Sequence, residues 1–185
     1  KKLKIINPIS NDLNFMRPSI LPNLIDAISR NVSRGYSNIG LFEVGPQYSS
    51  DDIEGQEEVL ALVRHGTFGG NHWMKRMHEF DLYDVKADFL SLLKEIGFTD
   101  NMITINNSAP SWYHPGRSGK ILNTKGETLG YFGEMNPKVL NQMNFIGRIV
   151  SAEIFLNKLA LEQKDNLSKG ALNLYDLQSV SRDFS

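Results

Sequence analysis

The sequence RSGKILNTKGETLGYFGE, residues 117–134, carries the clearest indication of the fold. Its two strand-like runs, 117–123 and 128–134, are separated by Lys125-Gly126, a pair typical of a hairpin turn. Working outward, we predict further strands at 39–44, 59–63, 102–106 and 148–156. Strands joined by short turns predict a sheet that is mostly antiparallel.

Three helical segments interrupt these strands. The first has Ser19 as its predicted cap and Gly35 as its terminator, and its apolar face is Ile20, Leu21, Leu24, Ile25, Ile28 and Val32. The second has Asp84 as its predicted cap and ends at Gly97. The third begins at Asn136-Pro137 and reaches about Met143. Because the helices do not alternate regularly with the strands, we predict an α+β fold with an antiparallel sheet flanked by helices.

Weaker local signals predict the remaining elements. Residues 3–6 read as a short strand that ends at Asn7-Pro8, and Gly45-Pro46 reads as a tight turn. The polar residues 49–57 and the glycine-rich residues 66–77 read as loops.

Composition limits the classes of function. The chain has 185 residues, 41% of them hydrophobic, a net charge of −1 and no cysteine. Thiol nucleophiles, disulfides and cysteine-ligated zinc are therefore excluded, and no overall charge favours a polyanion. No apolar run approaches the roughly 18 residues of a transmembrane helix, so we expect no membrane span. The start at Lys1 and the end at Ser185 lead us to expect a piece of a longer polypeptide.

Histidines and carboxylates offer candidates for metal or acid–base chemistry. His72 and His78 flank a loop near Glu79 and Asp81, but a zinc site needs three or four convergent ligands at shorter spacing. We interpret these histidines, and His65, as surface or packing residues. Asp84 is interpreted as a cap, and Asp88 follows one turn later, so Asp81, Asp84 and Asp88 are not predicted to be catalytic.

Two further patterns could bind phosphate or nucleic acid. Residues 66–70 are glycine-rich but lack the lysine and hydroxyl of a phosphate-binding loop. Lys75, Arg76 and His78 interleave with Trp73 and Phe80, which would suit a small nucleic-acid patch. We interpret the first as a loop, and keep the second as an alternative.

The segment Trp112–Gly119 gathers a histidine, an arginine and a serine around one predicted bend. Pro115 restricts His114, and Gly116 tolerates left-handed backbone geometry. Ser118 has no base at a known spacing and no nucleophile elbow around it. We therefore predict a strand entry in which His114 hydrogen-bonds the backbone.

Seven segments in order resemble one family. They are Asn7–Ser10, Met16–Leu24, Leu41–Gly45, Gly70–Trp73, Tyr83–Asp88, Tyr113–Gly119 and Gly130–Pro137. The series resembles the β subunit of bacterial phenylalanyl-tRNA synthetase, from the start of the chain to about Leu159. Residues 180–185 resemble the opening strand of the ferredoxin-like anticodon-binding domain that follows in that family.

The resemblance implies a class II aminoacyl-tRNA synthetase-like core at residues 1–162. It also implies a linker and the first strand of the next domain at 163–185. In this family the α subunit carries aminoacylation, and the β core supports it in a cytoplasmic heterotetramer of two α and two β chains. The parent ligase would use ATP and Mg²⁺ to join phenylalanine to tRNA. No cofactor is implied for this segment.

The residues support a noncatalytic core. An active class II site clamps ATP with an arginine in a strand–loop–strand motif and a second arginine at a helix start. Residues 41–48 contain no arginine and place Pro46 after Gly45, and residues 152–159 lack both the glycines and the arginine. We therefore assign no catalytic, cofactor-binding or metal residue, and expect a structural module that contacts the α subunit. A tRNA-contacting module and an active ATP-dependent ligase are the alternatives.

Overall fold

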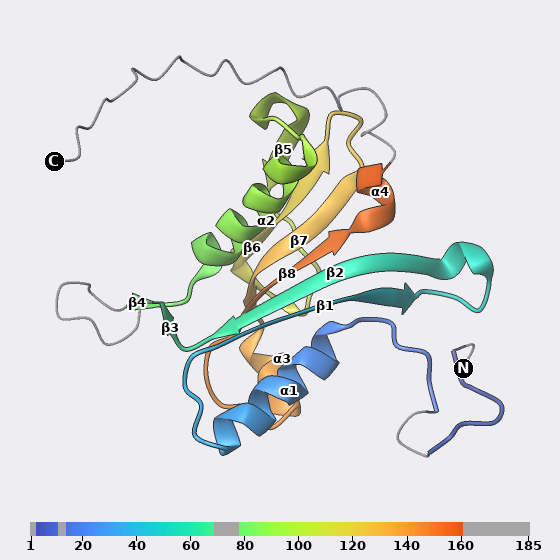
Figure 1. The fold of residues 1–185 in the computed structure, drawn as a ribbon, viewed down its shortest axis with the longest axis vertical. Coiled ribbons are helices and arrows are strands. Elements are labelled where there is room, and N and C mark those ends of the chain that lie inside the picture. The colour runs from blue at the N-terminus through green and yellow to red at the C-terminus, as the bar shows by residue number, and fades with distance from the viewer. Residues whose placement is uncertain (1–2, 11–13, 69–77, 161–185) are drawn as a thin grey trace, which may run out of the picture.

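A computed structural model describes residues 3–10, 14–68 and 78–160, and its centre is a six-stranded sheet (Figure 1). The strand order is β1-β2-β8-β7-β6-β5, and every neighbouring pair is antiparallel. The strands are β1 Ile39–Tyr48, β2 Gln56–His65, β5 Ile103–Asn106, β6 Tyr113–Asn123, β7 Thr128–Met135 and β8 Val150–Phe155. The predicted antiparallel sheet is confirmed. A separate pair joins β3 Thr67–Phe68 to β4 His78–Glu79.

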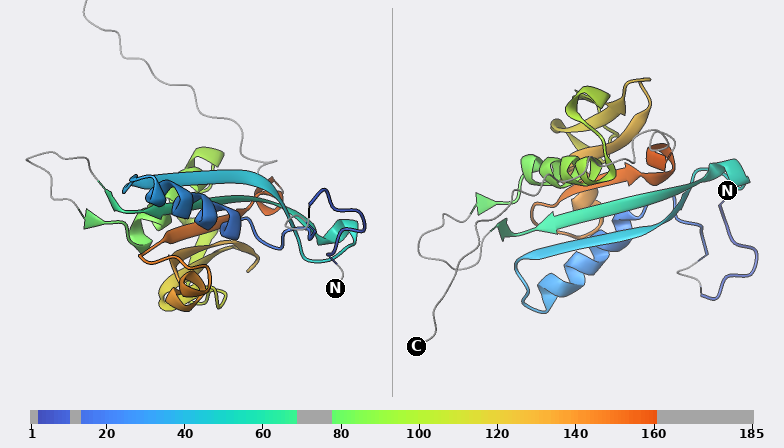
Figure 2. Two further views of the ribbon diagram at one scale, coloured as in Figure 1. Left: turned by 90° about the horizontal axis from the view of Figure 1, so that it is seen from below. Right: turned by 45° about the horizontal axis from the view of Figure 1, so that its top comes forward.

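Helices cover both faces of this sheet (Figure 2). They are α1 Leu21–Ser33, α2 Leu82–Ile96, α3 Pro137–Gln142 and α4 Leu156–Ala160, with short 3-10 turns η2 Ile53–Gly55 and η3 Asp100–Met102. Helices α1 and α3 contribute to one hydrophobic cluster, and α2 contributes to another across the sheet. In the described part of the chain, every helix is too short or too polar to cross a membrane.

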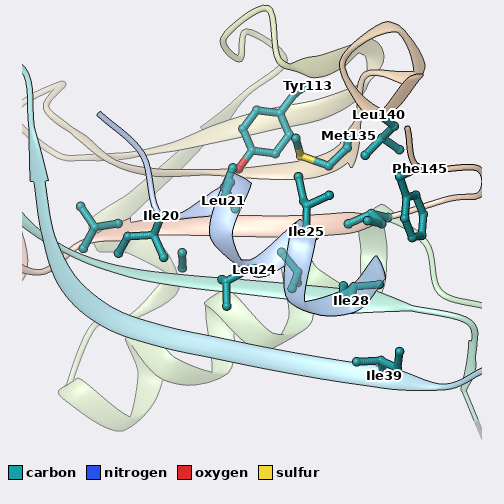
Figure 3. Close-up of a cluster of buried hydrophobic side chains, with 14 of the residues drawn as sticks. Ile20, Leu21, Leu24, Ile25, Ile28, Ile39, Tyr113, Met135, Leu140 and Phe145 are labelled. Atoms are coloured by element: carbon teal, nitrogen blue, oxygen red, sulfur yellow. The ribbon is translucent and has the colours of Figure 1, made fainter. Parts of the chain in front are cut away.

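The face toward α1 buries the apolar side of that helix (Figure 3). Leu21, Leu24, Ile25 and Ile28 are buried in one cluster with strand residues that include Val59 and Ala61. Each fully buried Leu or Ile contributes about 1.5–3 kcal/mol relative to an exposed position. The prediction for Val32 was wrong: it is 36% exposed, in the last turn of α1 beside exposed Arg34 and Gly35.

The face toward α2 is closed by aromatic and aliphatic packing. Phe89 is fully buried in a cluster with Ile121, Leu129 and Ile154. Gly130 allows this approach, because a Cβ there would lie 2.7 Å from Phe89 Cζ and 2.1 Å from the carbonyl oxygen of Glu153. The absence of a side chain at Gly130 thus sets the distance between α2 and the sheet.

Two of the three predicted caps are displaced by a residue or more. The cap position of α1 is Ile20 rather than Ser19, although the Ser19 hydroxyl accepts the Leu21 N–H at 3.1 Å. In α2 the cap is Asp81, which accepts the Tyr83 N–H at 2.7 Å. Asp84 returns a bond to the Asp81 N–H at 2.8 Å, so the two carboxylates form a reciprocal capping box. The caps or terminators at Asn136, Gly35 and Gly97 are confirmed.

Several strand boundaries differ from the prediction. β1 continues through Gly45-Pro46 without a turn, because β1 is an edge strand and Pro46 needs no N–H bond on its outer side. The Pro46 carbonyl instead accepts Arg17 Nε at 3.0 Å. The predicted strand at 3–6 is a single bridge between Lys4 and Phe15.

β8, a central strand of the sheet, ends at Phe155, one residue before the predicted end at 156, and α4 begins at Leu156. β6 begins at Tyr113, earlier than expected, with a register irregularity between Tyr113 and Ser118 in place of the predicted bend. The predicted turn at Lys125-Gly126 is confirmed, and Gly126 adopts a φ of 81°.

Candidate functional site

A buried carboxylate, Glu153, is the centre of a polar cluster inside the described chain. It lies in the middle of β8 and is 2% exposed. Its Oε1 accepts Ser19 Oγ at 3.2 Å and Gln47 Nε2 at 3.3 Å. Its Oε2 accepts Trp112 Nε1 at 3.1 Å and Tyr113 Oη at 3.2 Å. Both carboxyl oxygens are therefore fully satisfied by uncharged donors, as a buried carboxylate requires.

The fold brings these donors from three separate segments. Gln47 comes from the edge strand β1, Ser19 from the residues before α1, and Trp112 and Tyr113 from the start of β6. The Ser19 hydroxyl already accepts the Leu21 N–H, which leaves its proton to point at Glu153. Indole Nε1 can only donate. Both oxygens of the Glu153 carboxyl therefore accept hydrogen bonds.

Burial and hydrogen bonding act on the ionisation of this cluster in opposite directions. Burial raises the pKa of Glu153, while the bonds from Trp112, Gln47, Ser19 and Tyr113 lower it, and the net direction is upward from 4.5. The pKa of Tyr113 is raised well above 10.0, first by burial and then by the Glu153 charge. Tyr113 is therefore protonated at neutral pH and donates to the carboxylate.

An apolar cavity of about 290 Å³ adjoins the cluster. Two of its lining residues, Ser19 and Trp112, are also donors to Glu153. The remaining walls are Pro18, Leu21, Pro22, Ile25, Met135, Val139 and Met143. Such walls suit an uncharged apolar group and offer nothing to a phosphate.

The two segments predicted to correspond to the ATP-clamping motifs of an active class II site contain no arginine. β1 and β2 form a strand–loop–strand unit, and residues 41–48 of β1 contain no arginine. β8 leads directly into α4, and residues 152–159 across this junction contain neither glycine nor arginine. Lys158 of α4 pairs with Glu57 at 3.3 Å and lies 4.5 Å from the centroid of the Phe155 ring.

The histidine and carboxylate candidates take part in local contacts. His78 Nε2 lies 3.4 Å from Asp84 Oδ1, and Asp88 forms a two-bond ion pair with Arg64 at 2.6 and 2.9 Å. Among the described residues no three His, Cys, Asp or Glu side chains converge as metal ligands. His65 bonds the Arg148 carbonyl at 2.8 Å, and His72 lies outside the described residues.

Only part of the predicted basic patch lies within the described residues. Trp73, Lys75 and Arg76 lie outside the described residues, as do Gly69 and Gly70. Phe80 is buried, and the Arg64 guanidinium lies 5.1 Å from its ring centroid. Phe80 therefore belongs to the core of the α2 face and is not an open stacking surface.

The segment around His114 is held by local hydrogen bonds. His114 Nδ1 accepts the Gly116 N–H at 3.1 Å, and Ser118 Oγ donates to the His114 carbonyl at 2.6 Å. Arg117 makes two bonds to Glu134, at 2.7 and 3.0 Å. The predicted backbone contact of His114 is confirmed.

The sequence reasoning assigned no site residue and so missed the Glu153 cluster. A signal was present, because Glu153 stands inside the run Val150–Phe155, all of which is buried. A carboxylate within such a run requires several partners. Its partners Ser19, Gln47 and Trp112 could not be read from the sequence, because they lie 134, 106 and 41 residues away.

Comparisons with known proteins place these features in a family. The family model described as phenylalanyl tRNA synthetase beta chain CLM domain matches residues 1–156. The phenylalanine–tRNA ligase beta subunit of Rhodospirillum rubrum is 42% identical over 99% of this chain, and that of Paramagnetospirillum magneticum is 40% identical over 100%. The chain spans 23% of the length of each of these relatives.

Similarity to solved structures supports the fold alone. Two structures of pyrrolysyl-tRNA synthetase from Desulfitobacterium hafniense match with TM-scores of 0.58 and 0.59. They are 14% and 13% identical, covering 86% and 89% of this chain and 54% of theirs. The class II synthetase-like antiparallel sheet flanked by helices is thereby confirmed.

Proposed function

Because the chain belongs to the family of phenylalanyl-tRNA synthetase beta chain CLM domains, we propose that it is a noncatalytic core module of a phenylalanine–tRNA ligase. The observation that carries this proposal is the identity of the residues on β1 and β8. Residues 41–48 of β1 and residues 152–159 of β8 and α4 contain no arginine with which an active class II site would clamp ATP, and Pro46 follows Gly45 where the usual β-subunit pattern has an arginine. Loss of a preorganised charge clamp costs about 3–4 kcal/mol of transition-state stabilisation per group.

Residues 1–162 form this module in our proposal, and residues 163–185 lead into a following anticodon-binding domain. The parent ligase attaches phenylalanine to its tRNA with ATP and Mg²⁺ in the cytoplasm. In our proposal the chemistry belongs to the α subunit. The role of this chain is to support that subunit in an assembly of two α and two β chains.

Exposed apolar side chains support a partner-binding role. Phe42 and Val44 on β1 are 73% and 52% exposed, and Ile6, Ile9 and Phe15 before α1 are also exposed. Large apolar surface that is left open on a soluble domain is typical of an interface. The α subunit is the partner that we propose for it.

Co-purification tests the proposal directly. A tagged full-length β chain carrying this segment is expected to retain its α subunit and to aminoacylate tRNA with phenylalanine. Calorimetry of the 185-residue chain with ATP is expected to give no binding heat. Failure of the full-length chain to associate would overturn the partner role, and ATP binding by the isolated chain would favour an active ligase.

A tRNA-contacting function stays a prediction, since Trp73, Lys75 and Arg76 lie outside the described residues. Its test is a tRNA mobility shift that weakens as salt rises. A shift that persists in the matched triple variant Trp73→Ala, Lys75→Ala, Arg76→Ala would exclude this patch.

A further inference from the structure

The four donors around Glu153 have the geometry of an anion-binding site. They converge on two oxygens at 3.1–3.3 Å, and two of them, Trp112 Nε1 and Gln47 Nε2, present N–H groups that cannot accept. The hydroxyls of Ser19 and Tyr113 complete the set. No charged donor takes part, so the attraction for a negative group comes from aligned dipoles in a buried place.

We propose that this cluster is a carboxylate-binding cradle that the protein fills with its own side chain, Glu153. Without that side chain, the cradle would take a small monocarboxylate. The inference goes beyond the proposed function and rests only on the geometry of the cluster and its cavity.

The neighbouring cavity defines the rest of the ligand. Ser19 and Trp112 border both the cradle and the cavity of about 290 Å³. A molecule whose carboxylate takes the place of the Glu153 head group can therefore extend an apolar tail along Leu21 and Val139. The ligand class is a monocarboxylic acid with a short apolar or aromatic tail.

Replacement of Glu153 tests the cradle. Glu153→Ala opens the cradle, whereas Glu153→Gln keeps it filled with an uncharged group of similar size. In the full-length protein, acetate is expected to raise the melting temperature of Glu153→Ala in a saturable way, relative to chloride at equal ionic strength. The wild type and Glu153→Gln are expected to show no such rise, and acetamide is expected to have no effect on any of them.

A control variant with a cavity of apolar walls distinguishes binding by the four donors from the filling of any cavity. Ile154→Ala removes a fully buried side chain of the same strand on the opposite face, where the cluster is hydrophobic. Acetate is expected not to stabilise this variant. An equal response of Ile154→Ala and Glu153→Ala, or no response of Glu153→Ala, would overturn the proposal.

The tail is tested with 3-phenylpropionate in the Glu153→Ala background. It is expected to bind at least tenfold more tightly than acetate, measured by titration calorimetry. Adding Val139→Phe, which fills the cavity, is expected to remove that advantage and to leave acetate binding. Equal affinities before the cavity is filled would show that the ligand has no tail site.

A measurement on the wild type covers the case in which Glu153→Ala does not fold. The carboxyl carbon of Glu153, labelled with ¹³C and identified by its loss in Glu153→Gln, is expected to show the shift of an ionised group at pH 7. A neutral carboxyl at pH 7 would contradict a cradle built for an anion.

Discussion

The side of the sheet toward α1 and the side toward α2 share the same strands but bury different chemistry. In β8, Val150, Ala152 and Ile154 join the α2 cluster, which consists of apolar residues. The alternate residues Ser151 and Glu153 point to the other face and bury polar atoms. The stability of the α2 side therefore depends on how closely side chains fill its volume, whereas the stability of the α1 side also depends on the direction of each hydrogen bond.

The largest loss of stability should come from a cavity on the α2 side of the sheet. Phe89→Ala removes a fully buried ring and is expected to lower the free energy of unfolding by about 4 kcal/mol. Urea denaturation measures the loss, which should not vary with pH. Leu92→Ala, at a half-buried position of the same helix, is the control and should cost less. A loss below about 1 kcal/mol for Phe89→Ala would contradict close packing at this face.

The next largest loss of stability should come from a side chain added where the α2 side has no room for it. Gly130→Ala would place a Cβ 2.7 Å from Phe89 Cζ and 2.1 Å from the Glu153 carbonyl oxygen. We expect a loss of about 2–3 kcal/mol, because the sheet backbone cannot move aside as a flexible side chain can. The double variant Gly130→Ala, Phe89→Leu should recover only the ring clash, so the two changes will not add. Full recovery would show that the backbone contact is unimportant.

A smaller effect, dependent on pH, should distinguish the polar side. The pKa of Glu153 is raised by burial, so the folded chain holds this proton more tightly than the unfolded chain. The resulting stability is complete below the ordinary value of 4.5 and is lost as the pH rises through the raised pKa. The difference in unfolding free energy between wild type and Glu153→Gln should therefore shift against the wild type as pH rises. A difference that grows in favour of the wild type would reverse the sign of the inferred pKa change.

The smallest effect is expected at the segment around His114. His114→Ala removes the acceptor of the Gly116 N–H and should cost about 0.5–1 kcal/mol. In the assembled enzyme of our proposal, aminoacylation per folded molecule should stay unchanged. Ser118→Ala, which removes the donor to the His114 carbonyl, is the matched control and should behave alike. A selective loss of turnover in His114→Ala alone would assign chemistry to this histidine.

Features that depend on neighbours in the sequence could be predicted. The Asn136 cap, the left-handed Gly97 and the Lys125-Gly126 turn each depend on a few adjacent residues, and the structure has all three. The apolar face of α1 followed from helical periodicity. The order of motifs indicated the family before any contact was known.

Features that depend on distant residues could not be predicted. A proline reads as a turn unless its strand is known to lie at the edge of the sheet, which is the case for Pro46. Asp81 and Asp84 are equally good caps by composition, and only their reciprocal bonds decide between them. Glu153 looked like one acidic residue among many, because none of its donors is near it in sequence.

The bonds between Arg17 and the end of β1 also bear on aggregation. At Pro46 the outer edge of the sheet has no N–H to offer, and its carbonyl is taken by Arg17 Nε. The next outward N–H, that of Tyr48, is taken by the Arg17 carbonyl at 3.0 Å. An incoming strand from another molecule would find no free N–H at these two residues and an occupied carbonyl at Pro46, so this end of the edge resists sheet extension.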